Sequence, residues 1–483
     1  MHRSLCLFLL LAACSSSNSD PTPAPDAAAT DTEDPEDLGP PAPADWDRTV
    51  TRPSDDEAAK KRTACGFAKG ALAGETHGVS APVGKAIPID TIVIAMQENR
   101  SFDHYFYKLK ERGHPDAEVA PPDFTNPDLD GTPVKPFRDK QLCFLDTAHS
   151  WNAAHTEWND GKMDGFIEAN EETGAPPKGG TADLLRGTRA MGYYEPDDLP
   201  FMYWAADQFA IGDHYHCSVL TSTWTNRMYL YAASSFGRIS NKPPNVGTAL
   251  TIFDMLQMRR VKWKVYAGNT PPEAMFVSAF IKYRDHHYTT MDQFYVDAAN
   301  GTLPEVAFVD GSNGEGKPFV DSETDEHPPS VMQVGQALLA KVTKSLMASP
   351  QWERSAFFIN YDEHGGLFDH VPPPEACPPD DIPPERSASD APGDYKRLGI
   401  RVPFVVISPW TKKGFIGHHV YDHTSVTRFV EARFGLPAMS ARDANAEAPY
   451  DLFDFSKVRS DKPPVPEVKV DPEVLARCNA TFN

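Results

Sequence analysis

The chain has 483 residues, of which 40% are hydrophobic, so it is long enough to bury a large core. Its formal net charge at pH 7 is −22, and it contains no basic stripe. This charge argues against a nucleic-acid partner and against electrostatic attraction to an anionic membrane. The composition therefore favours a globular protein whose partner is neither a nucleic acid nor an anionic membrane surface.

The start of the chain has the pattern of an export signal. A basic beginning precedes the short apolar run 5–11, and the small residues before Cys14 resemble the bacterial lipobox. We expect residues 1–13 to be a cleaved signal peptide and Cys14 to carry lipid, which would anchor an exported bacterial protein to the membrane surface of the cell envelope. Plain secretion is the alternative, because the run is too short to stay as a membrane-spanning helix.

An acidic segment rich in proline and alanine follows. Between Ser15 and Glu57, twelve Asp and Glu residues stand against two Arg. Repulsion between these charges and the stiffness of proline predict a solvated tether over 14–84. The composition then becomes globular, so we expect one large domain over 85–460 and a C-terminal tail over 461–483.

Cysteine usage agrees with export. If Cys6 is removed and Cys14 is lipidated, five cysteines remain, and their irregular spacing does not resemble a zinc motif. Their number allows two disulfides and one spare thiol, while the pairing stays open. The five are Cys65, Cys143, Cys217, Cys377 and Cys478.

Short apolar segments alternate with helical patterns along the domain. Segments rich in β-branched or aromatic residues predict strands, and an apolar stripe with helical spacing predicts helices over 330–347 and 422–434. This alternation predicts an α/β fold with a mostly parallel sheet and helices on both faces. Each strand runs directly into polar residues, so we expect these ends to meet along one edge of the sheet. The predicted strands are 89–96, 306–309, 356–361 and 402–407.

Two side chains with oxygen donors, Glu98 and Asn99, follow the first predicted strand. A buried strand that delivers polar groups at its carboxyl end is how open α/β sheets present ligand sites. Carboxylate and amide oxygens suit Ca²⁺, Mg²⁺ or Mn²⁺ and are tolerated by Zn²⁺. A metal site is one interpretation, and a helix cap after a strand is the other.

A second pair of acids, Asp362 and Glu363, follows the predicted strand 356–361. Gly365 and Gly366 come next and let the backbone turn closely beside a bound group. A solvated turn is the alternative. Because the carboxyl ends of parallel strands share one edge, we expect this pair to lie near the first pair of oxygen donors.

Hydroxyl groups gather between Thr221 and Thr225, just before another helical pattern. A hydroxyl at a helix N-terminus lies in a field that stabilises its alkoxide and attracts phosphate oxygens. A nearby metal ion would lower its pKa further. The same residue types are also ordinary N-caps.

Four motifs, found in the same order, resemble those of one family. They are ENRSFDHYF from residue 98, STWTNR from 222, YDEHGGLFDHVPPP from 361 and YDHTSVTRFVEARFGLP from 421. The family is that of phosphoesterases which includes bacterial phosphatidylcholine-hydrolysing phospholipases C, plant non-specific phospholipases C and bacterial acid phosphatases. The resemblance covers 87–437 and implies an alkaline-phosphatase-like, three-layer α/β/α sandwich with a metal-assisted hydroxyl nucleophile.

The resemblance also implies roles for single residues. Thr223 would be the nucleophile, although this chain has Thr225 where proline is usual, so Thr221, Ser222 and Thr225 are the competing hydroxyls. One divalent metal ion would be bound, and its identity stays open between Ca, Mg, Mn and Zn. Its ligands would be Glu98, Asn99, Thr223, Asp362 and Glu363.

Histidines in the motifs are candidates for proton transfer and phosphate binding. His149 and His327 would bind phosphate oxygens or protonate the leaving group, because an imidazole with a pKa near neutrality can do both. Four further residues are expected to contact the substrate, with helix capping as the alternative for His423. They are His155, Asn226, His364 and His423.

The activity implied is that of a phospholipase C, which cleaves a phosphatidylcholine-type lipid to diacylglycerol and a phosphorylated head group through a phosphothreonine intermediate. The alternatives are an acid phosphatase that acts on phosphate monoesters and a surface-anchored binding protein with a decayed site. Five aromatic side chains are candidates either for a quaternary-ammonium cage or for the core. They are Trp151, Trp158, Tyr193, Tyr194 and Trp224. The oligomeric state stays open.

Overall fold

The computed structural model describes residues 40–482, except 174–175, 177–179, 245–248 and 315–321. One compact unit spans Gly39–Asn483. The expected signal peptide and Cys14 lie outside the described residues. Among the described helices, none has both the length and the apolar character needed to cross a membrane.

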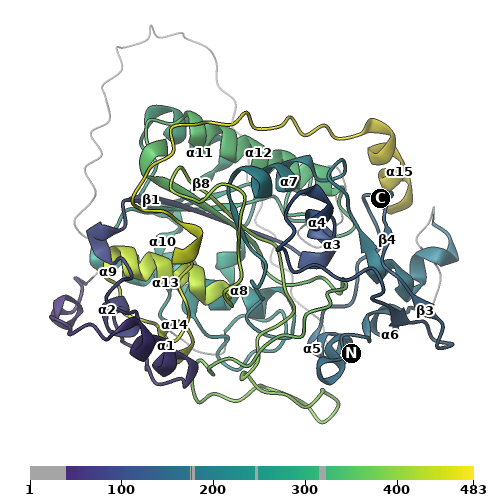
Figure 1. Ribbon diagram of the computed structural model, residues 1–483, viewed down its shortest axis with the longest axis horizontal. Coiled ribbons are helices and arrows are strands. Elements are labelled where there is room, and N and C mark those ends of the chain that lie inside the picture. Colours follow the sequence, from purple (N-terminus) through teal and green to yellow (C-terminus); the bar gives the residue numbers. More distant parts are fainter. Residues whose placement is uncertain (1–39, 174–175, 177–179, 245–248, 315–321, 483) are drawn as a thin grey trace, which may run out of the picture. The chain divides into compact units, whose positions relative to one another are not determined.

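An eight-stranded, mostly parallel sheet forms the centre of this unit (Figure 1). Its strands lie side by side in the order β12, β6, β11, β10, β1, β9, β7 and β8. Their bounds are β1 Thr91–Gln97, β6 Ala210–Gly212, β7 Trp263–Ala267, β8 Tyr288–Thr290, β9 Val306–Asp310, β10 Ser355–Tyr361, β11 Phe404–Ile407 and β12 Phe415–Gly417. The predicted fold class is confirmed.

Helices cover both faces of the sheet (Figure 1). Every residue of β1 and β10 is buried, which is why these strands read as almost continuous apolar runs. One face carries α7 Pro200–Gln208, α11 Met291–Asn300 and α12 Met332–Ala348. The other carries α8 Thr223–Ala232, α9 Ile252–Arg259 and α13 His423–Phe434.

Shorter elements complete the described fold. Two small sheets pair β2 Asn126–Pro127 with β3 Pro133–Val134, and β4 Phe137–Arg138 with β5 Gly192–Tyr193. The other α-helices are α1 Asp55–Thr63, α2 Ala73–Thr76, α3 Phe102–Phe106, α4 Leu109–Arg112, α5 Trp151–Trp158, α6 Phe166–Asn170, α10 Val277–His287, α14 Ala441–Ala444 and α15 Pro472–Phe482.

One strand runs in a direction that the sequence did not predict. β11 is antiparallel to both of its neighbours, β10 and β6. Ser408 therefore follows β11 at the opposite edge, where its hydroxyl donates to the carbonyl of Ser355, the first residue of β10, over 2.7 Å. The prediction that all four strand ends share one edge is wrong for the segment 402–407, because a local apolar run carries no information about strand direction.

Both ends of the described chain are folded into the compact unit. Within the predicted tether, α1 begins with a capping box between Ser54 and Glu57, and Cys65 is bonded to Cys377. Within the predicted tail, α15 is tied to the domain by a second disulfide, Cys143–Cys478. In the described part of the predicted tether, 40–84, and in the predicted tail, a helix and a disulfide therefore hold the chain to the domain. Cys217 is the remaining thiol, so these five cysteines form the expected two disulfides and leave one spare thiol. The Cys217 side chain is buried.

Candidate active site

The first wall of the site forms where β1 and β10 end. The last residues of these parallel strands are paired, so the chains leave the sheet side by side. The Asn99 N–H donates to Asp362 Oδ1 over 3.2 Å, although 263 positions separate the two residues in the sequence. The structure thus brings Glu98 and Asn99 beside Asp362 and Glu363.

The two turns after these strands touch each other. Asn99 has a φ of 60°, in the left-handed region that asparagine tolerates better than most residues. Gly365 has a φ of 64°, and a Cβ there would lie 2.5 Å from the Asn99 carbonyl oxygen. Glycine is therefore required at this position both by the backbone conformation and by the close approach.

A buried arginine that the sequence analysis did not single out joins the two acidic turns. Arg227, on α8, donates from Nη2 to Glu98 Oε1 over 3.0 Å and from Nε to Asp362 Oδ2 over 3.1 Å. It lies in the STWTNR motif, but residue type alone does not tell which acids a guanidinium reaches. Arg227 therefore orients one carboxylate of each pair.

Thr223 is the first residue of α8, and it lies one helical turn before Arg227. Residues four apart share a helix face, so Thr223 is on the face that meets the acidic turns. Two competing hydroxyls are occupied, because Thr221 donates to the Ile239 carbonyl over 2.6 Å and Thr225 donates to the Ser240 carbonyl over 3.4 Å. Within the described part of the chain, neither the Thr223 nor the Ser222 hydroxyl makes such a bond, and of these two only Thr223 lies one turn before Arg227 on α8.

The chemistry of the oxygen donors fits a divalent cation. Two buried atoms, Asn99 Oδ1 and Glu363 Oε1, have no hydrogen-bond partner among the described residues. Burial raises the pKa of Asp362 to about 7, against the lowering effect of Arg227, and burial also raises the pKa of Glu363. Buried acids and unpartnered hard oxygens are costly in an apolar interior unless a positive group binds there.

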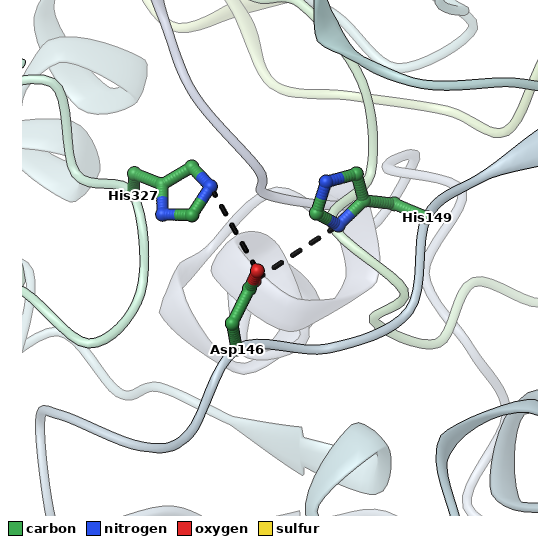
Figure 2. A group of neighbouring side chains, drawn as sticks. All are labelled: Asp146, His149 and His327. Atoms are coloured by element: carbon green, nitrogen blue, oxygen red, sulfur yellow. Dashed lines mark ion pairs between the residues drawn. The ribbon is translucent and has the colours of Figure 1, made fainter. Parts of the chain in front are cut away.

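A second wall consists of Asp146 and His149, which share the loop before α5, and His327 from another loop; the three side chains face one another (Figure 2). Asp146 Oδ1 lies 3.9 Å from His149 Nδ1, and its Oδ2 lies 3.9 Å from His327 Nε2. Asn99 Nδ2 is 3.4 Å from His149 Nδ1, so this wall adjoins the acidic turns. The structure brings the two predicted histidines together, and Asp146 is the member that sequence reasoning missed.

Neighbouring carboxylates raise the pKa values of both histidines. Burial works against a charged His149, but Glu363 and Asp146 raise its pKa to about 9. Burial also opposes the charge on His327, whose pKa is nevertheless raised by Asp146 and Glu98. Imidazoles with raised pKa values next to the acidic turns can bind a phosphate group and supply a proton.

A further group of acids has a structural role. Asp103, Asp369 and His370 place their polar atoms close together, but the buried guanidinium of Arg401 lies among them. Arg401 Nε donates to Asp369 Oδ1 over 2.8 Å, and His370 Nδ1 is 2.6 Å from Asp103 Oδ2. This internal neutralisation leaves no role for a metal ion there.

Three of the residues predicted to contact substrate bond to the protein itself through their polar atoms. The Asn226 amide bonds the loop before α8, donating to the Thr221 carbonyl over 2.8 Å. His423 is fully buried between the Asp362 carbonyl and the Tyr215 hydroxyl, and burial lowers its pKa to about 4. His364 is 1% exposed, and its Nε2 lies 2.6 Å from Glu157 Oε2.

His155 is also held within the protein. Its Nδ1 bonds the Trp151 carbonyl over 2.7 Å, and its ring lies over the Trp151 indole with centroids 4.3 Å apart. No contact among the described residues joins it to the group in Figure 2. Its predicted contact with substrate is therefore not supported by the geometry.

The aromatic candidates for a quaternary-ammonium cage have mostly core roles. Trp151 and Tyr194 are buried, and Arg397 lies 4.8 Å above the Trp158 ring. Tyr193 stacks on another tyrosine. Only Trp224, next to the candidate nucleophile, is partly exposed without an aromatic or cationic partner among the described residues.

The candidate site combines three features. It has oxygen donors at strand ends, a hydroxyl at the start of a helix, and two histidines on either side of a carboxylate. Groups of these types can support nucleophilic transfer with the help of a cation. The chain belongs to the phosphoesterase family, whose model matches residues 89–437. The match includes every residue of the two walls.

Named relatives agree with this family. The non-hemolytic phospholipase C of Burkholderia pseudomallei is 33% identical over 417 residues, which are 72% of this chain and 55% of that protein. This chain thus spans about half the length of that relative. Phospholipase C A of Mycobacterium tuberculosis is 31% identical over 75% of this chain and 76% of that protein. Non-specific phospholipase C1 of Arabidopsis thaliana is 31% identical over 79% and 74%.

Among solved structures, a Vibrio parahaemolyticus protein of the alkaline phosphatase superfamily is 10% identical, with a TM-score of 0.38. The alignment covers 88% of this chain and 93% of that one.

Proposed function

We propose that the protein is a metal-dependent phosphoric ester hydrolase of the phospholipase C type. The substrate would be a phosphatidylcholine-type lipid, and the products would be diacylglycerol and a phosphorylated head group. One observation on α8 carries this proposal. Thr223 lies one helical turn before Arg227, and Arg227 bonds both Glu98 and Asp362. The named phospholipase relatives support the substrate class.

The reaction runs through two displacements at phosphorus. Thr223 first gives its hydroxyl proton to solvent; its alkoxide oxygen Oγ1 then attacks the phosphorus atom, and the bond from phosphorus to the diacylglycerol oxygen breaks. His327 or His149 gives its proton to that departing oxygen. Water then attacks the phosphothreonine and gives a proton to the same histidine, while the bond from phosphorus to Thr223 Oγ1 breaks. The head-group phosphate leaves, and the Thr223 alkoxide and the protonated histidine are restored.

Glu98, Asn99, Asp362 and Glu363 would hold a divalent cation with the Thr223 oxygen. Bound there, the cation supplies positive charge that favours the alkoxide and the transferring phosphoryl oxygens. The protein's own contribution is orientation. Arg227 fixes two of the carboxylates, and the strand register fixes the two turns.

Replacing the nucleophile tests the proposal. Thr223→Ala should lower hydrolysis of phosphatidylcholine at least about 1,000-fold, while Thr223→Ser should retain part of it because a hydroxyl remains. Thr225→Ala is the matched control, because its hydroxyl already bonds a backbone carbonyl. Unfolding temperatures show that each variant is folded. Full activity of folded Thr223→Ala would overturn the assignment.

The same preparation separates the two classes of ester. A phospholipase C cleaves the phosphatidylcholine diester faster than an aryl phosphate monoester, and mass spectrometry of a quenched reaction should find the head-group phosphate on Thr223. Faster turnover of the monoester would favour an acid phosphatase instead.

We further propose that the enzyme is exported and attached to the cell envelope through lipid on Cys14.

A further inference from the structure

A buried carboxylate outside the donor set lies behind the acidic turn. Glu157, on α5, is 0% exposed, and its Oε2 lies 2.6 Å from His364 Nε2, on a ring that is itself 1% exposed. A buried charge of this kind is costly unless it is paired and hydrogen-bonded. The pair lies directly behind Glu363, the neighbour of His364 in the chain.

His364 links Glu157 to Glu363. Its second nitrogen, Nδ1, lies 3.5 Å from Glu363 Oε2, and the same oxygen accepts the Gly365 N–H over 2.7 Å. The Gly365 N–H therefore fixes Oε2 by a hydrogen bond, and His364 Nδ1, which has no hydrogen-bond partner among the described residues, lies next to the same oxygen. Glu363 Oε1 is the oxygen left without a partner among the described residues, so it is the one free to face a cation.

Asn170, the last residue of α6, ties this arrangement to the histidine loop. Its Nδ2 donates to Glu157 Oε1 over 3.2 Å and to the Gly366 carbonyl over 3.0 Å. Its Oδ1 accepts the Ala148 N–H over 2.7 Å, one residue before His149. A single buried amide thus joins Glu157, the acidic turn and the second wall of the site.

We propose that Glu157 is a positioning residue for the cation site. Through His364 it orients Glu363 so that Oε1 faces the ion, and through Asn170 it keeps the histidine loop in register with the acidic turn. This inference rests on the proposed function, because it assumes that Glu363 binds a cation. Partners behind metal ligands typically change metal affinity 10- to 100-fold when removed.

The test measures cation affinity, not turnover. Metal-depleted protein is titrated with Mn²⁺ alone, and free Mn²⁺ is followed by electron paramagnetic resonance. Glu157→Gln keeps the size of the side chain but removes its charge, and it should weaken Mn²⁺ binding about 10- to 100-fold. The matched control is Glu431→Gln on α13, a carboxylate that is equally buried and bonded to Arg428 over 2.7 Å.

The outcomes separate this inference from the proposed function. Wild-type protein that binds none of Mn²⁺, Ca²⁺, Mg²⁺ and Zn²⁺ overturns both. Wild-type binding with unchanged affinity in Glu157→Gln overturns the positioning role alone, as does an equal loss in Glu431→Gln. If Glu157→Gln does not fold, Asn170→Ser replaces it, because it removes the amide and keeps the carboxylate. Unchanged Mn²⁺ affinity in that variant overturns the inference as well.

Discussion

Asp146 presents one oxygen to each of two histidines, and it controls their charge. Its carboxylate is among the groups that raise the pKa of His327, against the effect of burial. A raised pKa keeps the imidazole protonated to higher pH, so an activity that needs this acid falls only when pH rises through that pKa. Asp146→Asn should therefore move the high-pH decline of kcat/KM to lower pH, as a pH profile of hydrolysis would measure.

The size of this shift should depend on salt, because the Asp146 side chain is 41% exposed and its charge is partly screened. Asp285→Asn is the control, since that side chain is 76% exposed on α10 and belongs to neither wall. A profile of Asp146→Asn that coincides with the wild-type profile would contradict the control of the acid's pKa by Asp146.

Among the elements, the C-terminal helix α15 is bonded to the loop that carries the second wall. Cys143–Cys478 joins them three positions before Asp146, and Arg477 donates to the Gln141 carbonyl over 2.7 Å. Removing this disulfide with Cys143→Ser and Cys478→Ser should lower kcat between about 3- and 100-fold, because small displacements of catalytic groups are costly. The rate is measured well below the unfolding temperature of the variant.

The other disulfide is a matched control for stability. Cys65–Cys377 closes a segment of 312 positions and Cys143–Cys478 one of 335, so their chain-entropy contributions differ by less than about 0.1 kcal/mol. Cys65→Ser with Cys377→Ser should therefore lose similar stability but keep kcat, since neither wall adjoins that bond. Equal losses of kcat in both double variants would contradict the positioning role of α15.

Local patterns predicted the elements that surround the site. β1, β9, β10, α12 and α13 begin and end within two residues of their predicted bounds, because apolar periodicity is a property of consecutive residues. The direction of β11 depends on pairing with distant strands, and no short segment encodes it. Strand ends could therefore be located from the sequence, whereas the edge on which Ser408 lies could not.

Within the site, too, the features encoded by neighbouring residues could be predicted, and those that depend on distant partners could not. Glu98 and Asp362 were found because each follows a buried strand and belongs to a motif. Arg227, Asp146 and Glu157 act through partners that lie far away in the chain, so their residue types alone gave no signal. His364 and His423 are in recognisable motifs, but whether a histidine faces substrate or the interior is decided by packing.

At the scale of the whole molecule, the net charge and the proposed lipid anchor have opposite effects on binding to a membrane. The net charge of −22 and the acidic residues between Ser15 and Glu57 disfavour approach to an anionic membrane. A lipid on Cys14 would overcome this repulsion, because acyl chains gain free energy from insertion that does not depend on surface charge. The proposed anchor therefore explains how so acidic an enzyme can remain at a lipid surface.

Cys14→Ser should release the protein from its membrane. In a bacterial host, fractionation should find wild-type protein with the membranes and the variant in the soluble exported fraction, because one hydrophobic attachment is lost. Cys6→Ser is the matched control, since Cys6 lies in the apolar run that precedes the expected cleavage site. If Cys14→Ser stays with the membranes and retains the mass of an acylated N-terminus, the anchor is elsewhere. If wild-type protein is itself soluble and unacylated, plain secretion accounts for the leader.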